Sequence, residues 1–115
     1  MFWYDNLYLG KKCLRQAGRL KYKIANRIPH RSVYLIVLPQ SDHSVLEIIP
    51  SAMLLQEAYP RDNLRVIGIG ANRREALELI RQIIDEVYRQ QGDFDVEAFV
   101  NQWAKFDDIA APVNQ

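Results

Sequence analysis

Apolar positions recur at helical spacing in the first thirty residues. From Asn6 to Ile28 they fall within one arc of roughly 140° when successive residues are placed about 100° apart, and basic residues fill the opposite side. Pro29 ends the pattern, because the residue before a proline is displaced from the helical region. The spacing therefore predicts an amphipathic helix over Asn6–Ile28 with one apolar face and one basic face.

The following apolar segments predict strands. Val33–Leu38 is an unbroken apolar run ended by Pro39, which is typical of a strand covered on both faces. The polar residues 40–44 separate it from Val45–Ile49, so these two strands are expected to form an antiparallel hairpin. Leu64–Ile69 predicts a third strand.

Three further helices complete the pattern. A short one is predicted over Ala52–Tyr59, after a proline and a capping serine. The strongest is Asn72–Gln91, because Asn72 and Glu75 form a capping box, one stripe is apolar and a glycine follows the last turn. A last helix is predicted over Val96–Phe106.

These elements predict one α+β domain in the order α-β-β-α-β-α-α. The domain is expected to span residues 1–106, with 107–115 as a frayed tail. A crossover through the short helix makes the third strand parallel to the second. The strand that is apolar on both faces belongs in the middle, so we expect a small three-stranded sheet of order 2-1-3, covered by helices.

Composition narrows the class of protein. The 115 residues are 49% hydrophobic and 25% charged, as in a globular domain that buries its own core. The single cysteine, Cys13, excludes an internal disulfide and a multi-cysteine zinc site. The aromatic residues at the N-terminus precede the positive charges, the reverse of a secretory signal, and no apolar run is long enough to span a membrane. We expect a cytoplasmic protein with no cofactor and no metal.

The net charge of +1 conceals an uneven distribution. Residues 1–31 carry eight basic and one acidic residue, a balance of +7, whereas residues 32–115 carry seven basic and thirteen acidic residues, a balance of −6. A basic helix face with a tyrosine among its cations can neutralise phosphates and stack on a base. The same face suits an acidic protein partner or anionic lipid, or it can be balanced by the acidic remainder of this chain or of a second copy. The candidate contact residues are Lys12, Arg15, Arg19, Tyr22, Lys23 and Arg27.

A glycine-containing turn between the third strand and the strongest helix is a second candidate site. Glycines let a phosphate approach the backbone, and a helix N-terminus supplies N–H groups. The dinucleotide-binding pattern needs a third glycine where Arg73 stands, and the Gly-Lys-Ser/Thr of a P-loop is absent, so a tight turn is the simpler interpretation. The candidate anion-binding residues are Gly68, Gly70, Asn72, Arg73 and Arg74.

Aromatic residues gather at the two ends of the chain. Core packing is their default role, but a three-stranded sheet is small for so many rings, and protein interfaces favour aromatic residues. The candidate interface residues are Trp3, Phe99, Trp103 and Phe106. The segment 41–44 holds the residue types of a catalytic triad, yet neighbours on a hairpin tip cannot face one another in the required relay.

Three functional hypotheses follow. The first is a non-enzymatic protein-interaction module that forms a homodimer through its surface helices. The second is a nucleic-acid-binding protein that uses the basic helix, and the third, which is weaker, is an anion-binding or catalytic domain at Gly68–Arg74. No paired carboxylates, nucleophile motif or metal-ligand spacing favours an enzyme.

Overall fold

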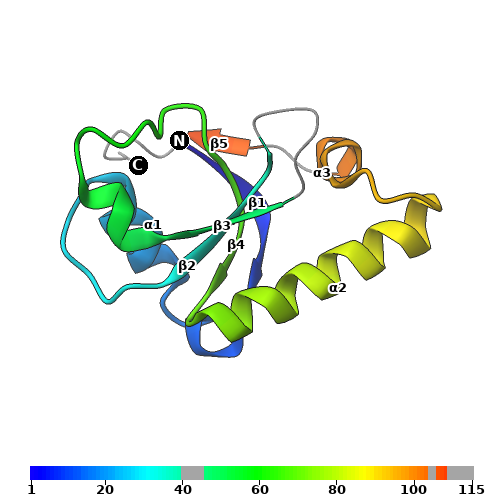
Figure 1. Ribbon diagram of the computed structural model, residues 1–115, viewed down its shortest axis with the longest axis horizontal. Coiled ribbons are helices and arrows are strands. Elements are labelled where there is room, and N and C mark those ends of the chain that lie inside the picture. Colours follow the sequence, from blue (N-terminus) through cyan, green and yellow to red (C-terminus); the bar gives the residue numbers. More distant parts are fainter. Residues whose placement is uncertain (40–45, 104–105, 109–115) are drawn as a thin grey trace.

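The protein is an α+β domain built around one mixed sheet (Figure 1). The computed structural model describes residues 1–39, 46–103 and 106–108, and its described side chains end at Asn101. The predicted hairpin tip at 40–44 and the tail at 109–115 therefore lie outside the described residues.

Five strands form the sheet, in the order β3-β2-β4-β1-β5. Strand β1 (Phe2–Leu9) runs parallel to β4 (Arg65–Gly70). Strand β2 (Tyr34–Val37) is antiparallel both to β4 and to β3 (Glu47–Pro50). Strand β5 (Phe106–Asp108) pairs antiparallel with β1 at the far edge.

The predicted three-stranded sheet is wrong in its number of strands, because β1 and β5 extend it, whereas the predicted order 2-1-3 is found as β3-β2-β4 within the larger sheet. The three predicted strands do occur next to one another, with β2 between β3 and β4. Two of the added residues, Asp107 and Asp108, belong to β5 rather than to a frayed tail. Phe106 likewise lies in β5 and not at the end of a helix.

The first predicted helix is shorter than expected. Its first residues lie in β1, followed by a 3-10 turn, η1 (Lys11–Cys13), and only then by α1 (Ala17–Ala25). The Gly10 N–H donates to the Ile69 carbonyl oxygen at 2.9 Å, so the β1–β4 ladder continues where a helix was expected. Leu14, which the helical arc placed on the apolar side, is 60% exposed.

The remaining helices agree more closely with the pattern. Helix α2 (Arg73–Gln91) is confirmed, with the Asn72 side chain accepting the Glu75 N–H at 2.8 Å and Gly92 closing the last turn at φ 78°. The short helix is a 3-10 helix, η2 (Ser51–Leu55), and α3 spans Val96–Trp103.

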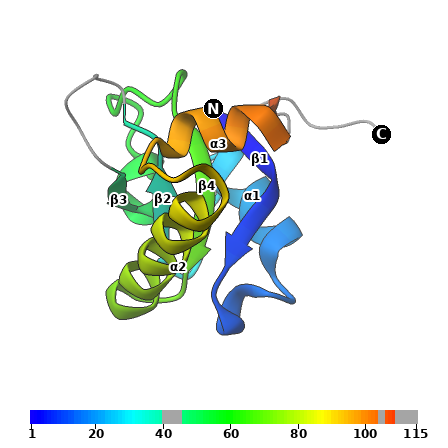
Figure 2. The ribbon, with the colours of Figure 1, turned by 90° about the vertical axis from the view of Figure 1, so that its right-hand side faces the viewer.

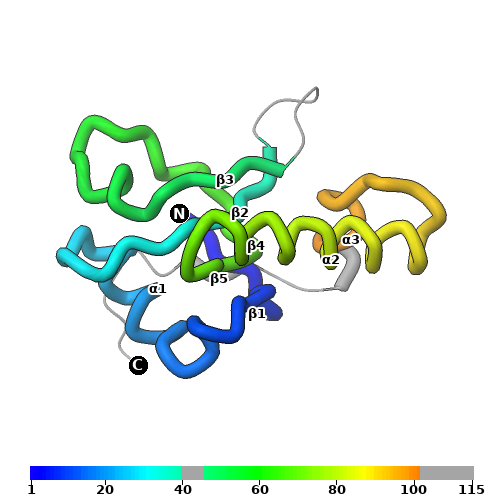
Figure 3. The backbone as a smooth tube through the Cα atoms, turned by 60° about the horizontal axis from the view of Figure 1, so that its bottom comes forward, coloured from blue at the N-terminus to red at the C-terminus, as the bar shows by residue number. Residues whose placement is uncertain are grey.

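The two faces of the sheet bury two separate halves of the core. Helix α1, η1 and η2 cover one face, and α2 and α3 cover the other (Figure 2). Figure 3 shows α2 crossing the sheet, with α3 near its C-terminal end. Alternate residues of β2 serve the two halves, since Leu35 and Val37 face α1 whereas Ile36 faces α2. Because the strand is fully covered, its unbroken apolar run is explained.

A buried arginine holds the end of α1. Arg61, 8% exposed, donates from its two terminal nitrogens to the Ile24 and Ala25 carbonyl oxygens at 2.6 and 2.7 Å. These carbonyls belong to the last turn of the helix, where the regular donors four residues ahead are missing, and the Ile24 carbonyl also accepts the Arg27 N–H at 3.3 Å. Burial lowers the pKa of Arg61, and the positive charge of Arg27 lowers it further. Arg27 itself has a left-handed backbone, φ 55°, and turns the chain out of the helix.

Candidate functional site

Two neighbouring parallel strands send the chain to opposite faces of the sheet. After β1 the chain passes through η1 to α1 on one face, whereas after β4 it enters α2 on the other. Such a divergence creates a crevice at the carboxyl ends of parallel strands, where ligands of open α/β sheets bind. The segment that follows β1 and the glycine-containing turn that follows β4 meet at this end of the sheet (Figures 1 and 2), where the Gly10 N–H donates to the Ile69 carbonyl oxygen.

The crevice itself is filled by a side chain of the protein. Glu75 Oε1 accepts the Ala71 N–H at 2.7 Å, and a Cβ atom added to Gly10 would overlap this carboxylate. A carboxylate thus lies where a bound phosphate would receive backbone N–H groups. The Asn72 side chain is engaged in capping α2. The Ala71 and Glu75 N–H groups are therefore engaged within the protein, and a phosphate at this turn would have to displace the Glu75 carboxylate.

The glycines of β4 serve close packing. A Cβ atom at Gly70 would lie 2.7 Å from the backbone nitrogen of Ala76 in α2, and one at Gly68 would lie 3.0 Å from the Tyr8 carbonyl oxygen. Both glycines are buried. They let α2 and β1 approach β4. This packing role favours a tight turn, and not a phosphate-binding loop, as the interpretation of the segment.

The arginines after this turn remain on the surface. Arg73 and Arg74 are exposed on the first turn of α2, immediately before Glu75. Lys11 and Lys12 are exposed immediately after Gly10, and Gly10 touches the Glu75 side chain. The two pairs therefore lie close to one contact point. With two more exposed cations that follow in sequence they make up a surface that we name the basic end: Lys11, Lys12, Arg15, Arg19, Arg73 and Arg74.

The Glu75 carboxylate lies at the centre of the basic end, but no described carboxylate forms an ion pair with its cations. The ion pairs among the described side chains are Arg65–Glu97 at 2.8 Å and Arg89–Asp85 at 3.0 Å, and neither involves the basic end. Several carboxylates instead gather from the last turns of α2 through α3, namely Asp85, Glu86, Asp93, Asp95 and Glu97. Arg74 and Asp85 both lie on α2, eleven residues apart, so about 16 Å of helix separates the nearest members of the two charge groups.

The other predicted contact residues are placed differently. Tyr22 is 50% exposed on α1, and Lys23 is half-buried. Arg27 is half-buried beside Arg61, and its Nε is buried without a hydrogen-bond partner. Both arginines line a pocket of about 390 Å³ near Met1. We therefore leave Arg27 out of the basic end.

The predicted interface aromatics are divided between the core and the undescribed side chains. Trp3 and Phe99 are 1% and 5% exposed, so neither ring lies on the outer surface, where a partner protein would contact it. A five-stranded sheet offers the burial area that a three-stranded sheet lacked. Trp103 and Phe106 belong to α3 and β5, but their side chains lie outside the described part of the chain.

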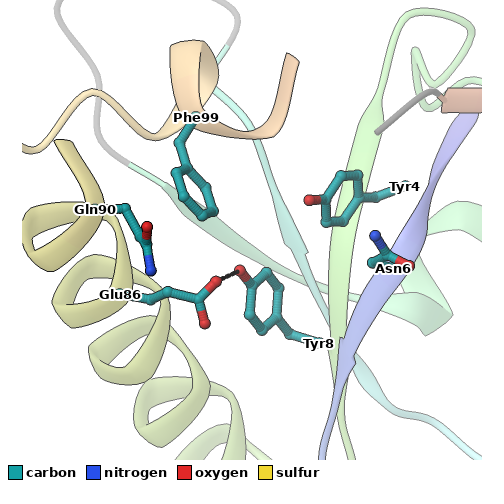
Figure 4. A pocket seen from close by; sticks show the side chains of 6 residues that line it. All are labelled: Tyr4, Asn6, Tyr8, Glu86, Gln90 and Phe99. Carbon is teal, nitrogen blue, oxygen red and sulfur yellow. Dashed lines mark hydrogen bonds between the residues drawn. The ribbon is translucent and has the colours of Figure 1, made fainter. Parts of the chain in front are cut away.

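A pocket that the sequence did not predict lies between β1, α2 and α3. Strand β1 directs Tyr4, Asn6 and Tyr8 to one face, because side chains alternate along a strand. Helix α2 contributes Glu86 and Gln90, one turn apart, and α3 contributes Phe99 (Figure 4). The pocket has a volume of about 390 Å³.

The pocket combines aromatic rings with one carboxylate. The Tyr8 hydroxyl donates to Glu86 Oε1 at 2.9 Å, and the rings of Tyr4 and Tyr8 stack with centroids 6.2 Å apart. Burial, and then the charge of Glu86, raise the pKa of Tyr4. Burial and the hydrogen bond to Glu86 raise the pKa of Tyr8. Both tyrosines are thus neutral near pH 7, and Glu86 is the charged group of the lining.

The described part of the chain also pairs His30 Nε2 with the buried Ser51 Oγ at 2.8 Å, and this oxygen accepts the Val33 N–H at 2.9 Å. The same described part of the chain contains no group of three histidine, cysteine, aspartate or glutamate residues arranged to hold a metal ion. No helix within the described residues combines the length and the apolar character needed to cross a membrane. Cys13 is buried, and burial raises the pKa of its thiol. No protein-family model, curated protein or solved structure matches this chain.

Proposed function

We propose that this protein is a non-enzymatic binding module that holds nucleic acid through its basic end. The observation that carries the proposal is that the Gly10–Glu75 contact brings Lys11 and Lys12 close to Arg73 and Arg74, with Arg15 and Arg19 exposed next in sequence. None of these six cations forms an ion pair with a described carboxylate. A nucleic-acid backbone presents regularly spaced phosphates, and each one that is neutralised by lysine or arginine releases condensed counterions. Exposed, unpaired cations are suited to this exchange because they lose no internal partner on binding.

A protein partner is supported less well. The expected homodimer depended on terminal aromatics, and Trp3 and Phe99 are buried in the core. Lysine is depleted in the cores of protein–protein interfaces, whereas surfaces that bind nucleic acid are strongly positive. Tyr22, half exposed on α1, provides a ring that can stack on an unpaired base. Because phosphate contacts carry no base identity, we expect little sequence preference.

The proposal is tested by fluorescence anisotropy with labelled single- and double-stranded DNA and RNA at about 50 mM salt, where charge interactions are weakly screened. We expect the double variant Arg15→Gln/Arg19→Gln to bind about tenfold more weakly or worse. The matched control is Arg81→Gln/Arg89→Gln, which removes the same charge from exposed positions further along α2. It is expected to bind within about threefold of the wild type, since it leaves the basic end intact.

Three outcomes would contradict the proposal. No binding of any of the four nucleic acids by the wild-type protein would remove it. Binding of polyglutamate without binding of nucleic acid would replace it with an acidic protein partner. Equal losses in the two double variants would show that net charge, and not the basic end, determines the affinity.

A further inference from the structure

Three aromatic rings surround the pocket between β1, α2 and α3. Tyr4 and Phe99 are 3% and 5% exposed, so their positions are fixed by the core, and Tyr8 is partly buried between them and α2. Figure 4 shows the three rings and the Glu86 carboxylate directed toward a common space. The face of an aromatic ring carries negative potential, which attracts a cation placed over it.

The negative charge of Glu86 is not paired with any cation among the described side chains. Two arginines near the pocket are paired with other carboxylates, Arg89 with Asp85 at 3.0 Å and Arg65 with Glu97 at 2.8 Å. Glu86 receives one hydrogen bond, from the neutral Tyr8 hydroxyl to its Oε1. The pocket therefore presents a carboxylate that no described cation neutralises.

The size and the rim of the pocket restrict the ligand. A volume of about 390 Å³ is at the small end of the range for ligand pockets, roughly 300–1,000 Å³. Asn6 and Gln90 are exposed and line the opening, where their amides can donate to or accept from a polar part of the ligand. An alkylated ammonium group needs ring faces and a nearby negative charge more than it needs hydrogen-bond acceptors.

We propose that this pocket binds a small organic cation whose alkylated ammonium group lies against Tyr4, Tyr8 and Phe99, with Glu86 as its counter-ion. The site is separate from the basic end and does not depend on the binding of nucleic acid. It lies toward the acidic C-terminal part of α2 and beside α3, where the surrounding carboxylates favour a positive ligand over a phosphate-bearing one.

The test compares choline with its uncharged isostere 3,3-dimethyl-1-butanol in isothermal titration calorimetry with the full-length protein. We expect choline to bind about tenfold more tightly, because the two molecules share a shape and differ in charge. Glu86→Gln is expected to weaken choline binding about tenfold, whereas the control Glu78→Gln, on the same helix and outside the pocket lining, is expected to change it less than about twofold.

A second variant keeps the test decisive if Glu86→Gln fails to fold. Tyr8→Phe retains the ring and removes the hydroxyl that occupies Glu86 Oε1, so choline binding is expected to persist within about threefold or to tighten. Equal affinity for choline and the alcohol, or no heat from choline at tens of millimolar, would overturn the proposal. Loss of choline binding in folded Tyr8→Phe would also overturn the assigned role of the ring.

Discussion

Substitution of Gly70 by alanine tests the interpretation of the glycine-containing turn. Gly70 is the last residue of β4, and the backbone of α2 crosses directly over it. The added Cβ atom would lie 2.7 Å from the Ala76 nitrogen and 3.0 Å from the Ala76 Cα. Both neighbours are helical backbone, so no flexible side chain can move aside.

The cost follows from this geometry. Non-bonded heavy atoms are most stable at about 3.5–4.0 Å, so α2 must move away from the sheet by roughly 1 Å. Overpacking of this kind costs typically about 1–3 kcal/mol and occasionally more. Displacement of α2 also loosens Leu79 and Ile83, which are buried against the sheet. We expect a loss of about 2–4 kcal/mol, which corresponds to a decrease of about 30- to 1,000-fold in the folding equilibrium constant.

The assay is urea unfolding followed by circular dichroism, with Gly18→Ala as the matched control. Gly18 lies in the first turn of α1, is exposed, and has nothing within 4 Å of the position of its Cβ atom. The same chemical change should therefore stabilise the protein there, by up to about 1 kcal/mol, because alanine favours the helix. The two substitutions are expected to shift the unfolding midpoint in opposite directions.

A Gly70→Ala variant within about 0.5 kcal/mol of the wild type would refute the packing interpretation, because ordinary surface substitutions fall in that range. If such a stable variant also lost affinity for nucleic acid, the glycine would be a contact for phosphate. Loss of stability with unchanged affinity per folded molecule is the result that the structure predicts.

Three further predictions concern single groups. Arg61→Met should destabilise the protein by about 2–4 kcal/mol in urea unfolding, because two buried carbonyls of α1 lose charged donors. The control Arg19→Met, on the exposed side of α1, should change the stability by less than about 0.5 kcal/mol. Equal effects of the two substitutions would contradict the role of Arg61. Cys13 should react with a disulfide reagent at least about a hundredfold more slowly in the native protein than in urea, since it is buried and its pKa is raised; a fast native reaction would show that η1 opens. The pKa of the Tyr8 hydroxyl is raised above its ordinary value of about 10, so the folded state holds this proton more strongly than the unfolded state does. The stability that this group contributes is complete below about pH 10 and is lost as the pH rises further. Tyr8→Phe should therefore reduce the loss of stability at alkaline pH in urea unfolding, and an unchanged loss would exclude this tyrosine as its source.

Local signals explain the elements that the sequence predicts well. Helix α2 has its capping box, its apolar stripe and Gly92 within one segment, so its bounds follow from neighbouring residues. Strand β2 is predicted by an apolar run that both faces of the sheet require. The apolar stripe does not fix the burial of each of its residues, since Leu77, three residues before Ile80 on the same side of α2, is 51% exposed.

Strand β1 could not be predicted from helical spacing alone. Leu7 fits the apolar arc of a helix, but the aromatic residues on either side of it favour a strand. The pairing that decides between them is made with β4, some sixty residues away, as in Phe2 opposite Arg65. Non-local pairing of this kind leaves no local signal in the sequence beyond the strand-forming residues themselves.

The candidate sites, like strand β1, depend on contacts between segments that are distant in the sequence. The cations of the first predicted helix and the pair Arg73 and Arg74 were recognised as two separate features. The contact between Gly10 and Glu75 brings the start of the first group close to the second. The pocket was missed because its lining comes from β1, α2 and α3. Its one available signal was the alternation of Tyr4, Asn6 and Tyr8, which the helical interpretation concealed.

The salt dependence of binding to duplex DNA tests the central claim most directly. If all six cations of the basic end contact phosphates, the slope of log K against log salt is expected to be about −5, and affinity should fall about a thousandfold between 50 and 200 mM salt. The variant Arg15→Gln/Arg19→Gln should bring the slope to about −3.6, and Arg81→Gln/Arg89→Gln should leave it unchanged. A wild-type slope near zero, or the same slope in all three proteins, would contradict the assignment of the basic end as the surface that binds nucleic acid.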